Sequence, residues 1–168
     1  MKTLPLFILA LFAHTSIFAA EQICDESLPA WTPDDQFERH DDGTVTDTRT
    51  GLTWQTCELG KSGASCQGSS RQTGWDEATQ MANNSQVGGF TDWRLPSIEE
   101  LLSIAEDRCI DPSINANIFP NSSPSQVWTS WIADELKGGA WFVHFLDGTP
   151  GLQYKGDPAA IRLVRGAN

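Results

Sequence analysis

The sequence contains few positively charged residues, and this scarcity excludes several classes of partner. Its 168 residues include 11 Lys and Arg against 22 Asp and Glu, which gives a formal net charge of −11 at pH 7. Nucleic acids and anionic lipids bind clustered basic side chains, and an acidic surface repels them. We therefore expect no nucleic-acid partner, and we interpret Lys155, Arg162 and Arg165 as scattered surface or strand-end charges.

Histidine is also scarce, which argues against catalysis by a nucleophile and a base. Of the three His residues, His14 falls in an N-terminal leader, so only His40 and His144 remain for the mature chain. The acidic residues often come in adjacent pairs, and adjacent side chains on a strand or a helix point in different directions. We expect no enzyme, assign no catalytic residue, and place both remaining His residues at the surface.

The sequence lacks the ligand spacing of a zinc site, because it has no CxxC motif and no His near a Cys. Asp41, Asp42 and Asp47 surround a turn and could offer oxygen atoms to calcium. The stretch lacks the loop spacing and the final Glu of an EF-hand, and a plain Asp-Gly turn explains the same residues. We therefore expect no cofactor and keep the three Asp residues as weak calcium candidates.

The only long apolar run lies at the N-terminus. Lys2 precedes a nearly all-apolar stretch from Leu4 to Leu11, and the small residues Ala19 and Ala20 follow. This pattern predicts a cleaved secretory signal peptide over residues 1–20. The run is too short to span a membrane, which takes about 20 apolar residues. We expect a periplasmic or secreted protein without membrane insertion.

Four cysteines follow the leader, at Cys24, Cys57, Cys66 and Cys109. An even count in an exported domain predicts disulfide bonds, and three pairings are possible. We favour Cys57–Cys66, which closes a short Gly- and Ser-rich loop. The remaining pair, Cys24–Cys109, would then tie the N-terminal tail to the end of the second predicted helix.

The clearest local signal lies between Thr91 and Leu102. Ser97 and Glu100 have the spacing of a capping box, and apolar residues follow at helical spacing. We interpret Arg94 as a half-buried guanidinium that pairs with Asp92 or with backbone carbonyls rather than with a ligand. The structural motif therefore consists of Trp93, Arg94, Leu95, Pro96, Ser97 and Glu100.

Strands are predicted on both sides of two helices, which indicates an α+β fold with a mostly antiparallel sheet. Residues 37–47 are predicted to form a hairpin around Asp42-Gly43. The first predicted helix covers residues 73–84 and begins with a Thr73–Asp76 capping box. The second runs from residue 98 to a point before Asp111-Pro112. The other predicted strands are 52–55, 127–130, 141–145 and 160–165. Residues 111–126 and 131–140 are predicted loops.

Seven tryptophans are many for a chain of this size. Five of them fit apolar faces and are predicted to lie in the core, namely Trp54, Trp75, Trp93, Trp128 and Trp141. Trp31 and Trp131 fit no periodic face. An exposed ring at Trp131 could stack on a sugar or on a side chain of a protein partner, so the candidate ligand contacts are Trp131, Asn121 and His144.

The ordered set of motifs resembles the Lcl C-terminal domain family, a bacterial family grouped with C-type lectin-like folds. The resemblance covers about residues 37–166 and rests on Gly43–Asp47, Thr50–Trp54, Trp75–Ala78, Gly88–Pro96, Trp128–Ser130, Trp141–Phe145 and Arg162–Arg165. It implies a single domain over residues 21–168. It also implies an exported module of the kind found in adhesive or surface proteins.

Two related families differ from this chain at their functional motifs. Arg94-Leu95-Pro96 before an acidic helix is similar to formylglycine-generating enzymes, but the copper-binding cysteine pair of those enzymes is missing near the C-terminal strands. The Glu-Pro-Asn, Gln-Pro-Asp and Trp-Asn-Asp motifs of calcium-dependent lectins are absent as well. The sequence therefore implies neither activity.

Three functions follow from these observations, in order of preference. The first is an exported, non-enzymatic binding or adhesion module that recognises a carbohydrate or a surface protein. The second is a structural component of a pilus or another surface assembly. The third is an enzyme, either hydrolytic or similar to formylglycine-generating enzymes, which the missing nucleophile and base disfavour.

Overall fold

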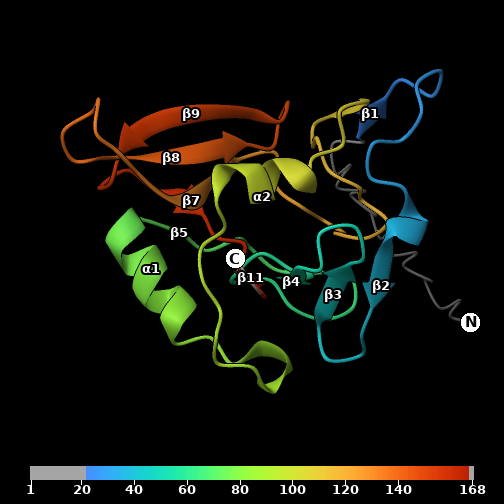
Figure 1. Ribbon diagram of the computed structural model, residues 1–168, viewed down its shortest axis with the longest axis horizontal. Coiled ribbons are helices and arrows are strands. Elements are labelled where there is room, and N and C mark those ends of the chain that lie inside the picture. The colour runs from blue at the N-terminus through green and yellow to red at the C-terminus, as the bar shows by residue number, and fades with distance from the viewer. Residues whose placement is uncertain (1–21, 167–168) are drawn as a thin grey trace, which may run out of the picture.

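The computed structural model describes residues 22–166, which form two α-helices and three β-sheets (Figure 1). Strands come first, the two α-helices follow in the middle of the chain, and strands close it. This order confirms the predicted α+β class and the predicted order of strands, two helices and strands. The predicted signal peptide, residues 1–20, lies outside the described residues.

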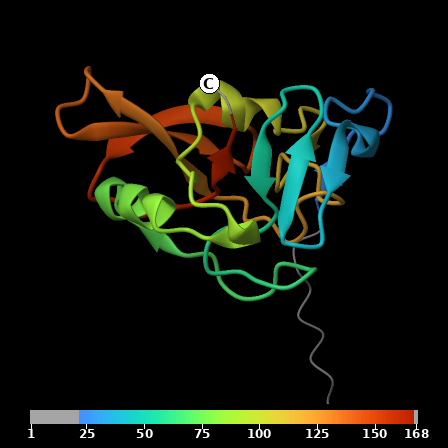
Figure 2. The ribbon, with the colours of Figure 1, turned by 60° about the horizontal axis from the view of Figure 1, so that its bottom comes forward.

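A four-stranded antiparallel sheet contains the predicted hairpin. Its spatial order is β11 (Val164–Arg165), β4 (Thr53–Gln55), β3 (Thr44–Asp47) and β2 (Phe37–Arg39). A 3₁₀ helix, η1 (Asp34–Gln36), leads into β2. Gly43 has a φ of 85° in the turn between β2 and β3, which glycine adopts without a Cβ clash. The Asp42-Gly43 turn is confirmed, and Figure 2 shows the two strands side by side.

A five-stranded sheet forms the other end of the molecule (Figures 1 and 2). Its spatial order is β5 (Gln72–Thr73), β10 (Ala159–Ala160), β7 (Gln126–Ala133), β8 (Gly139–His144) and β9 (Thr149–Tyr154). β10 runs parallel to β7, and the other pairs are antiparallel. The single closing strand predicted over 160–165 is wrong, because β10 and β11 belong to different sheets.

Both predicted helices are present, as α1 (Trp75–Asn83) and α2 (Ile98–Ser103), with a 3₁₀ turn, η2 (Val87–Gly89), between them. The capping box of α2 is confirmed. Ser97 Oγ accepts a hydrogen bond from the Glu100 N–H at 3.2 Å, and the Glu100 carboxylate accepts one from the Ser97 N–H at 2.7 Å. The acidic first turn of α2 also fits the positive end of the helix dipole.

Two helix predictions are wrong. A capping box at Thr73 and Asp76 does not form, because Gly74 caps α1 and the Thr73 hydroxyl donates to Glu77 instead. The second helix ends at Ser103 and does not continue toward Asp111. Beyond it residues 104, 107 and 108 form turns, and the buried Glu106 carboxylate accepts hydrogen bonds from the backbone N–H groups of Trp31 and Thr32.

The interior consists of two clusters of buried apolar side chains. The first lies between the four-stranded sheet, α2 and the strands β7 and β8, and it contains Trp54, Leu101 and Val143. The second lies under α1 and contains Trp93 and Trp128. Trp54, Trp93 and Trp128 are buried as predicted, whereas Trp75 and Trp141 are only half-buried. The loop over 111–126 is anchored by buried Ile114, Ile118 and Phe119.

Arg162 is not a surface charge as predicted, because only 1% of it is exposed. It lies in a segment whose neighbours Ile161 and Leu163 are fully buried between the two larger sheets. Its guanidinium donates to two backbone carbonyls and to Ser122 Oγ, and it lies 3.8 Å from the buried Glu58 carboxylate. A charged group buried this deeply needs such partners to offset lost hydration.

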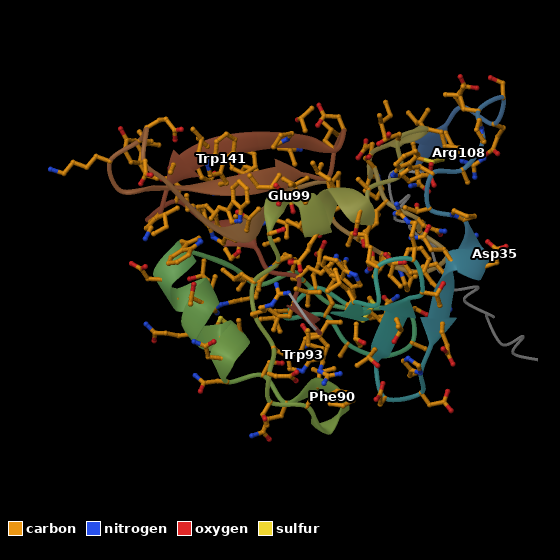
Figure 3. The ribbon with its side chains drawn as sticks, in the orientation of Figure 1. Asp35, Phe90, Trp93, Glu99, Arg108 and Trp141 are labelled. Atoms are coloured by element: carbon orange, nitrogen blue, oxygen red, sulfur yellow. A yellow bond between two sulfur atoms is a disulfide. The ribbon has the colours of Figure 1, made fainter. Side chains whose placement is uncertain are left out.

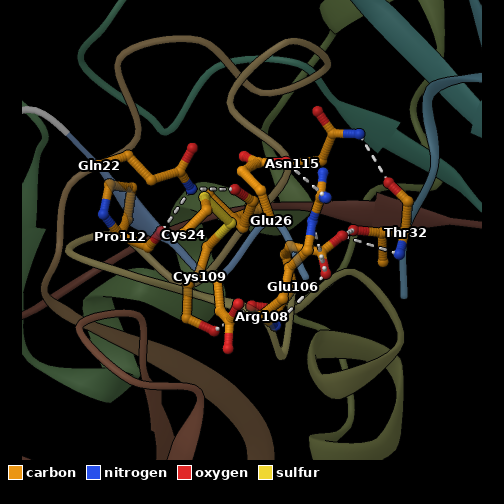
Figure 4. The surroundings of a disulfide bond; sticks show 12 residues. Gln22, Cys24, Glu26, Thr32, Glu106, Arg108, Cys109, Pro112 and Asn115 are labelled. Atoms are coloured by element: carbon orange, nitrogen blue, oxygen red, sulfur yellow. Dashed lines mark hydrogen bonds and ion pairs between the residues drawn. A yellow bond between two sulfur atoms is a disulfide. The ribbon is translucent and has the colours of Figure 1, made fainter. Parts of the chain in front are cut away.

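Both predicted disulfides are confirmed, Cys57–Cys66 and Cys24–Cys109. Cys24 and Cys109 face each other in register on β1 (Ile23–Cys24) and β6 (Cys109–Ile110), which form the third sheet. The bond therefore joins two strands, whereas the sequence suggests a bond between the N-terminal tail and the end of the second helix. Figure 4 shows this disulfide beside Glu106, which accepts from the Thr32 N–H and hydroxyl.

Candidate functional site

One end of the β7–β8–β9 meander carries a row of exposed and half-buried aromatic and apolar side chains. The register pairs Trp141 with Leu152 and Gly139 with Tyr154. Paired residues and residues two apart share one face of a sheet, so Trp141, Leu152 and Tyr154 lie on the same face. Tyr154 is 57% exposed and Leu152 is 36% exposed. Figure 3 shows Trp141 on the sheet beyond the first turn of α2, which carries Glu99.

The same sheet face is covered at its other end. Val127 pairs with Val143, and both belong to the buried cluster that contains Leu101 of α2. Because Val143 and Trp141 are two residues apart on β8, they share a face. α2 therefore covers the end of the face near Val143, whereas the exposed Leu152 and Tyr154 lie toward the other end.

Trp131 lies inside β7 and not in a loop, which corrects the predicted end of that strand at residue 130. Its neighbour Ile132 pairs with Ala140, on the face opposite to Trp141. Alternation along the strand then gives Trp131 the face of Trp141. Trp131 is 45% exposed. We define the aromatic face as Trp131, Trp141, Leu152 and Tyr154.

The aromatic face rests on an irregular but well-bonded stretch of β7. The register between β7 and β8 shifts between Trp128 and Ile132. Within the shift, the buried Thr129 hydroxyl donates to the Trp141 carbonyl at 2.9 Å and accepts from the Trp131 N–H at 3.2 Å. Such bulges re-aim side chains at sheet edges and beside functional sites. Thr129 thereby ties the backbones of both tryptophans together.

Sequence reasoning missed Tyr154 and Leu152 as members of this surface. Residues 149–154 contain Pro150 and Gly151, which weaken a strand pattern, so β9 was not predicted. The apolar residues at 152 and 154 keep the period of two, and this spacing was the available signal.

The other two candidate ligand contacts do not join Trp131. His144 pairs with Gln126 at the opposite end of β8, and its Nδ1 accepts from the Leu146 N–H at 3.1 Å. Asn121 lies in the 111–126 loop with a φ of 50°, and its side chain donates to the Cys66 carbonyl at 2.8 Å. The structure therefore places the three predicted residues in three separate surroundings.

A cleft of about 620 Å³ lies between the β2–β3 turn and the loop closed by the Cys57–Cys66 disulfide. It is a second candidate for a binding site. Asp41 and Asp42 line it, together with residues of β3, β4 and the disulfide loop. Hydrogen bonds from Thr44 lower the pKa of Asp42 below its usual value, so this carboxylate is charged at neutral pH.

The three weak calcium candidates are divided by the structure. Asp47 does not line the cleft, and its buried carboxylate accepts from Gln36 Nε2, the Arg49 N–H and the Thr50 hydroxyl. These bonds build the turn between β3 and β4. Within residues 22–166, no group of three or more His, Cys, Asp and Glu side chains is arranged to hold a metal ion.

Arg94 has structural partners, as predicted, and they include a backbone carbonyl but not Asp92: its Nη1 donates to the Leu95 carbonyl at 3.3 Å. Its guanidinium binds the Glu100 carboxylate through two hydrogen bonds of 2.7 Å. Asp92 pairs instead with Arg165 Nε, also at 2.7 Å. Burial raises the pKa of Glu100, but the bonds from Arg94 and the Ser97 N–H outweigh burial and hold it below its usual value. The charged Glu100 thus links Arg94 to the cap of α2.

No curated protein matches the chain. Two disulfides are typical of proteins that fold in an oxidising compartment. None of the helices within residues 22–166 has the length and apolar character needed to cross a membrane. The family model described as the Lcl C-terminal domain matches residues 43–165, which is most of the chain. The chain therefore belongs to the Lcl C-terminal domain family, as its motifs predicted.

Proposed function

We propose that the chain is an exported, non-enzymatic binding module that recognises carbohydrate through its aromatic face. The observation that carries this proposal is the exposure of Trp131 and Tyr154, with the half-buried Trp141 between them, on one end of a hydrogen-bonded sheet. Aromatic rings offer a broad apolar surface together with a polar atom, and they lose little conformational freedom on binding. The C–H groups on one side of a sugar ring pack against such a surface.

The arrangement of the aromatic face suits a ligand longer than one sugar ring. The three strands that carry it lie side by side, and neighbouring strands are about 4.8 Å apart. Tyr154 lies opposite Ala133 across β8, so the backbones at Trp131 and Tyr154 are separated by about 10 Å across the strands and by two residues, about 7 Å, along them. Exposed Asp134, Glu135 and Lys137 in the adjoining loop supply polar groups for sugar hydroxyls.

The proposal of a binding module rather than an enzyme rests on what surrounds the aromatic face. His144 lies on the face of β8 opposite to Trp141 and at the opposite end of that strand. His40 directly follows β2, which belongs to the four-stranded sheet. A nucleophile–base pair needs the two groups within hydrogen-bonding distance, and these imidazoles are remote from the aromatic face. The two disulfides support the proposed export.

A glycan array tests the proposal, with the oxidised mature chain over residues 21–168 as the sample. We expect hits among neutral oligosaccharides, with the same signals in calcium and in EDTA. Trp131→Ala and Tyr154→Ala should lose those hits while their thermal unfolding stays close to that of the wild type. Hits that both variants retain would contradict the assignment of the site, and an array without hits would contradict the ligand class.

A further inference from the structure

We propose that the cleft beside the β2–β3 turn is a second binding site, for an organic cation. The ligand class is a primary ammonium or guanidinium group on a short aliphatic stem. This site is separate from the aromatic face, because the hairpin and the meander lie at opposite ends of the molecule (Figures 1 and 2). It does not depend on the proposed binding of carbohydrate.

The cleft has the size and the construction of a small-molecule site. Its volume of about 620 Å³ falls within the range of about 300–1,000 Å³ that is usual for such pockets. Asp41, Asp42 and Gly43 form one wall, and residues 62–64 form the other. The Cys57–Cys66 disulfide closes the loop of the second wall and holds it in place.

Gln55 brings a buried and incompletely bonded side chain to the cleft. It pairs with Thr44 across β3 and β4, and both residues line the cleft. The preceding residue, Trp54, belongs to the core. Because successive side chains of a strand point to opposite faces, Gln55 points to the cleft side of the sheet. Gln55 is only 3% exposed, and Nε2 donates to Ser85 Oγ at 3.3 Å. Its Oε1 has no hydrogen-bond donor among residues 22–166.

Two carboxylates lie at the mouth of the cleft, those of Asp41 and Asp42. Asp41 is exposed and makes no hydrogen bond or ion pair within residues 22–166 that would neutralise it. Asp42 uses Oδ1 to accept two bonds from Thr44, and Oδ2 has no donor in the described part of the chain. A buried amide oxygen and two carboxylates together select a ligand that donates hydrogen bonds and carries positive charge.

Arg39, His40 and Lys61 line the cleft, and none of them forms an ion pair with Asp41 or Asp42 within residues 22–166. His40 Nε2 shares a hydrogen bond with Thr46 Oγ1 at 2.9 Å. Lys61 Nζ is held by Glu58 at 3.1 Å, by Ser123 Oγ at 2.8 Å and by the Asn121 carbonyl. Arg39 pairs with the core residue Val45, so its side chain leaves the sheet on the face away from Gln55. The aliphatic stem of a ligand would lie against Leu59 and Val87, which also line the cleft.

The test compares three probes with one stem and different head groups, namely n-pentylammonium, 1-pentanol and pentanoate. Each is titrated at low ionic strength into ¹⁵N-labelled mature chain, with backbone amide shifts as the readout. We expect pentylammonium to shift the amide signals of residues 40–44 and 55–64. The other two probes should bind more weakly by a factor of about ten at least, because they lose a charge-assisted hydrogen bond.

Variants separate a built site from general attraction to an acidic protein. Asp41→Asn with Asp42→Asn keeps the Thr44 turn, because an Asn side chain also accepts hydrogen bonds, and it should weaken pentylammonium binding about tenfold or more. Gln55→Leu should also weaken it without changing the charge. The control Asp134→Asn with Glu135→Gln removes the same charge from a different loop and should leave binding unchanged.

Four outcomes would overturn the proposal. They are equal weakening by the control, equal binding of 1-pentanol, amide shifts spread over the whole chain, and displacement of pentylammonium by Ca²⁺ with the same local shifts. The last outcome would make the cleft a metal site. Failure of the glycan array has no bearing on this test, because the probes contain no sugar.

Discussion

Replacing Glu58 by Gln removes the negative charge from a buried cluster of charged residues. Glu58 is 2% exposed, and its carboxylate lies 3.1 Å from Lys61 Nζ and 3.8 Å from Arg162 Nη2. The same carboxylate accepts two hydrogen bonds of 2.8 Å from the Ser123 N–H and hydroxyl. Every neighbour of the carboxylate is therefore a donor or a cation. The amide NH₂ of Gln in place of one carboxylate oxygen would face a donor.

The expected loss of stability is large because both cations stay buried. Side chains of Arg162 and Lys61 are 1% and 6% exposed, so neither gains much water when the carboxylate is lost. Removal of one partner from a buried ion pair typically costs about 3–5 kcal/mol. We expect Glu58→Gln to lower the free energy of unfolding by about 3 kcal/mol, near the lower end of that range, because Arg162 keeps its contacts with two carbonyls and Ser122. The melting temperature should fall by about 6–12 °C.

The same carboxylate predicts a dependence on pH. Burial acts to raise the pKa of Glu58, but the charges of Arg162 and Lys61 and the hydrogen bonds from Ser123 hold it below its usual value. A carboxylate whose pKa is lower in the folded state stabilises the protein fully above its unfolded pKa, which is about 4.3 for Glu. That stabilisation is lost as the pH falls through the folded pKa. The difference in free energy of unfolding between the wild type and Glu58→Gln should be constant above about pH 5 and should shrink below it.

Urea unfolding of the oxidised chain, followed by tryptophan fluorescence from pH 3 to pH 7, measures both effects. Glu26→Gln is the matched control, because the Glu26 side chain is 77% exposed and its bond to Arg108 lies at the surface. Its cost should stay within about 1 kcal/mol. The reasoning is refuted if Glu58→Gln costs no more than this control, or if the gap between wild type and variant does not change with pH.

Two further predictions concern the anchors of the fold. Replacing Cys24 and Cys109 by Ser should cost about 4–5 kcal/mol, and replacing Cys57 and Cys66 about 2–3 kcal/mol, because the closed loops span 85 and 9 residues. Equal losses in guanidinium unfolding would contradict this entropic account. Ser97→Ala should cost about 1 kcal/mol through loss of the α2 cap, also by guanidinium unfolding. A loss below about 0.3 kcal/mol would show that Glu100 and its partners hold the helix start without the serine.

Features that depend on neighbouring residues could be predicted from the sequence. The capping box of α2 needs only the three-residue spacing of Ser97 and Glu100, and the hairpin needs only Asp42-Gly43 between two strand-forming stretches. The Cys57–Cys66 bond was favoured because its loop is short, and the second bond then followed from what remained. In these cases the partners are close along the chain or few in number.

Features that depend on distant segments could not be predicted. Arg162 lies in a stretch of alternating apolar residues, and nothing near it reveals that Glu58, more than a hundred residues earlier, lies beside it in the interior. Trp131 looked like a loop residue because the register shift in β7 interrupts the alternation of apolar residues. Tyr154 was missed because Pro150 and Gly151 obscure its strand. The aromatic face therefore became visible only once the three strands were paired.

The central claim, that the aromatic face binds carbohydrate, is tested most directly by affinity electrophoresis of Trp131→Ala and Trp31→Ala. Both tryptophans are exposed, at 45% and 55%, but Trp31 lies in the N-terminal segment and not on the aromatic face. The gels contain the neutral polysaccharide selected by the array. We predict that the polysaccharide retards the wild type and Trp31→Ala equally and no longer retards Trp131→Ala. Equal retardation of all three proteins, or loss only in Trp31→Ala, would contradict the claim.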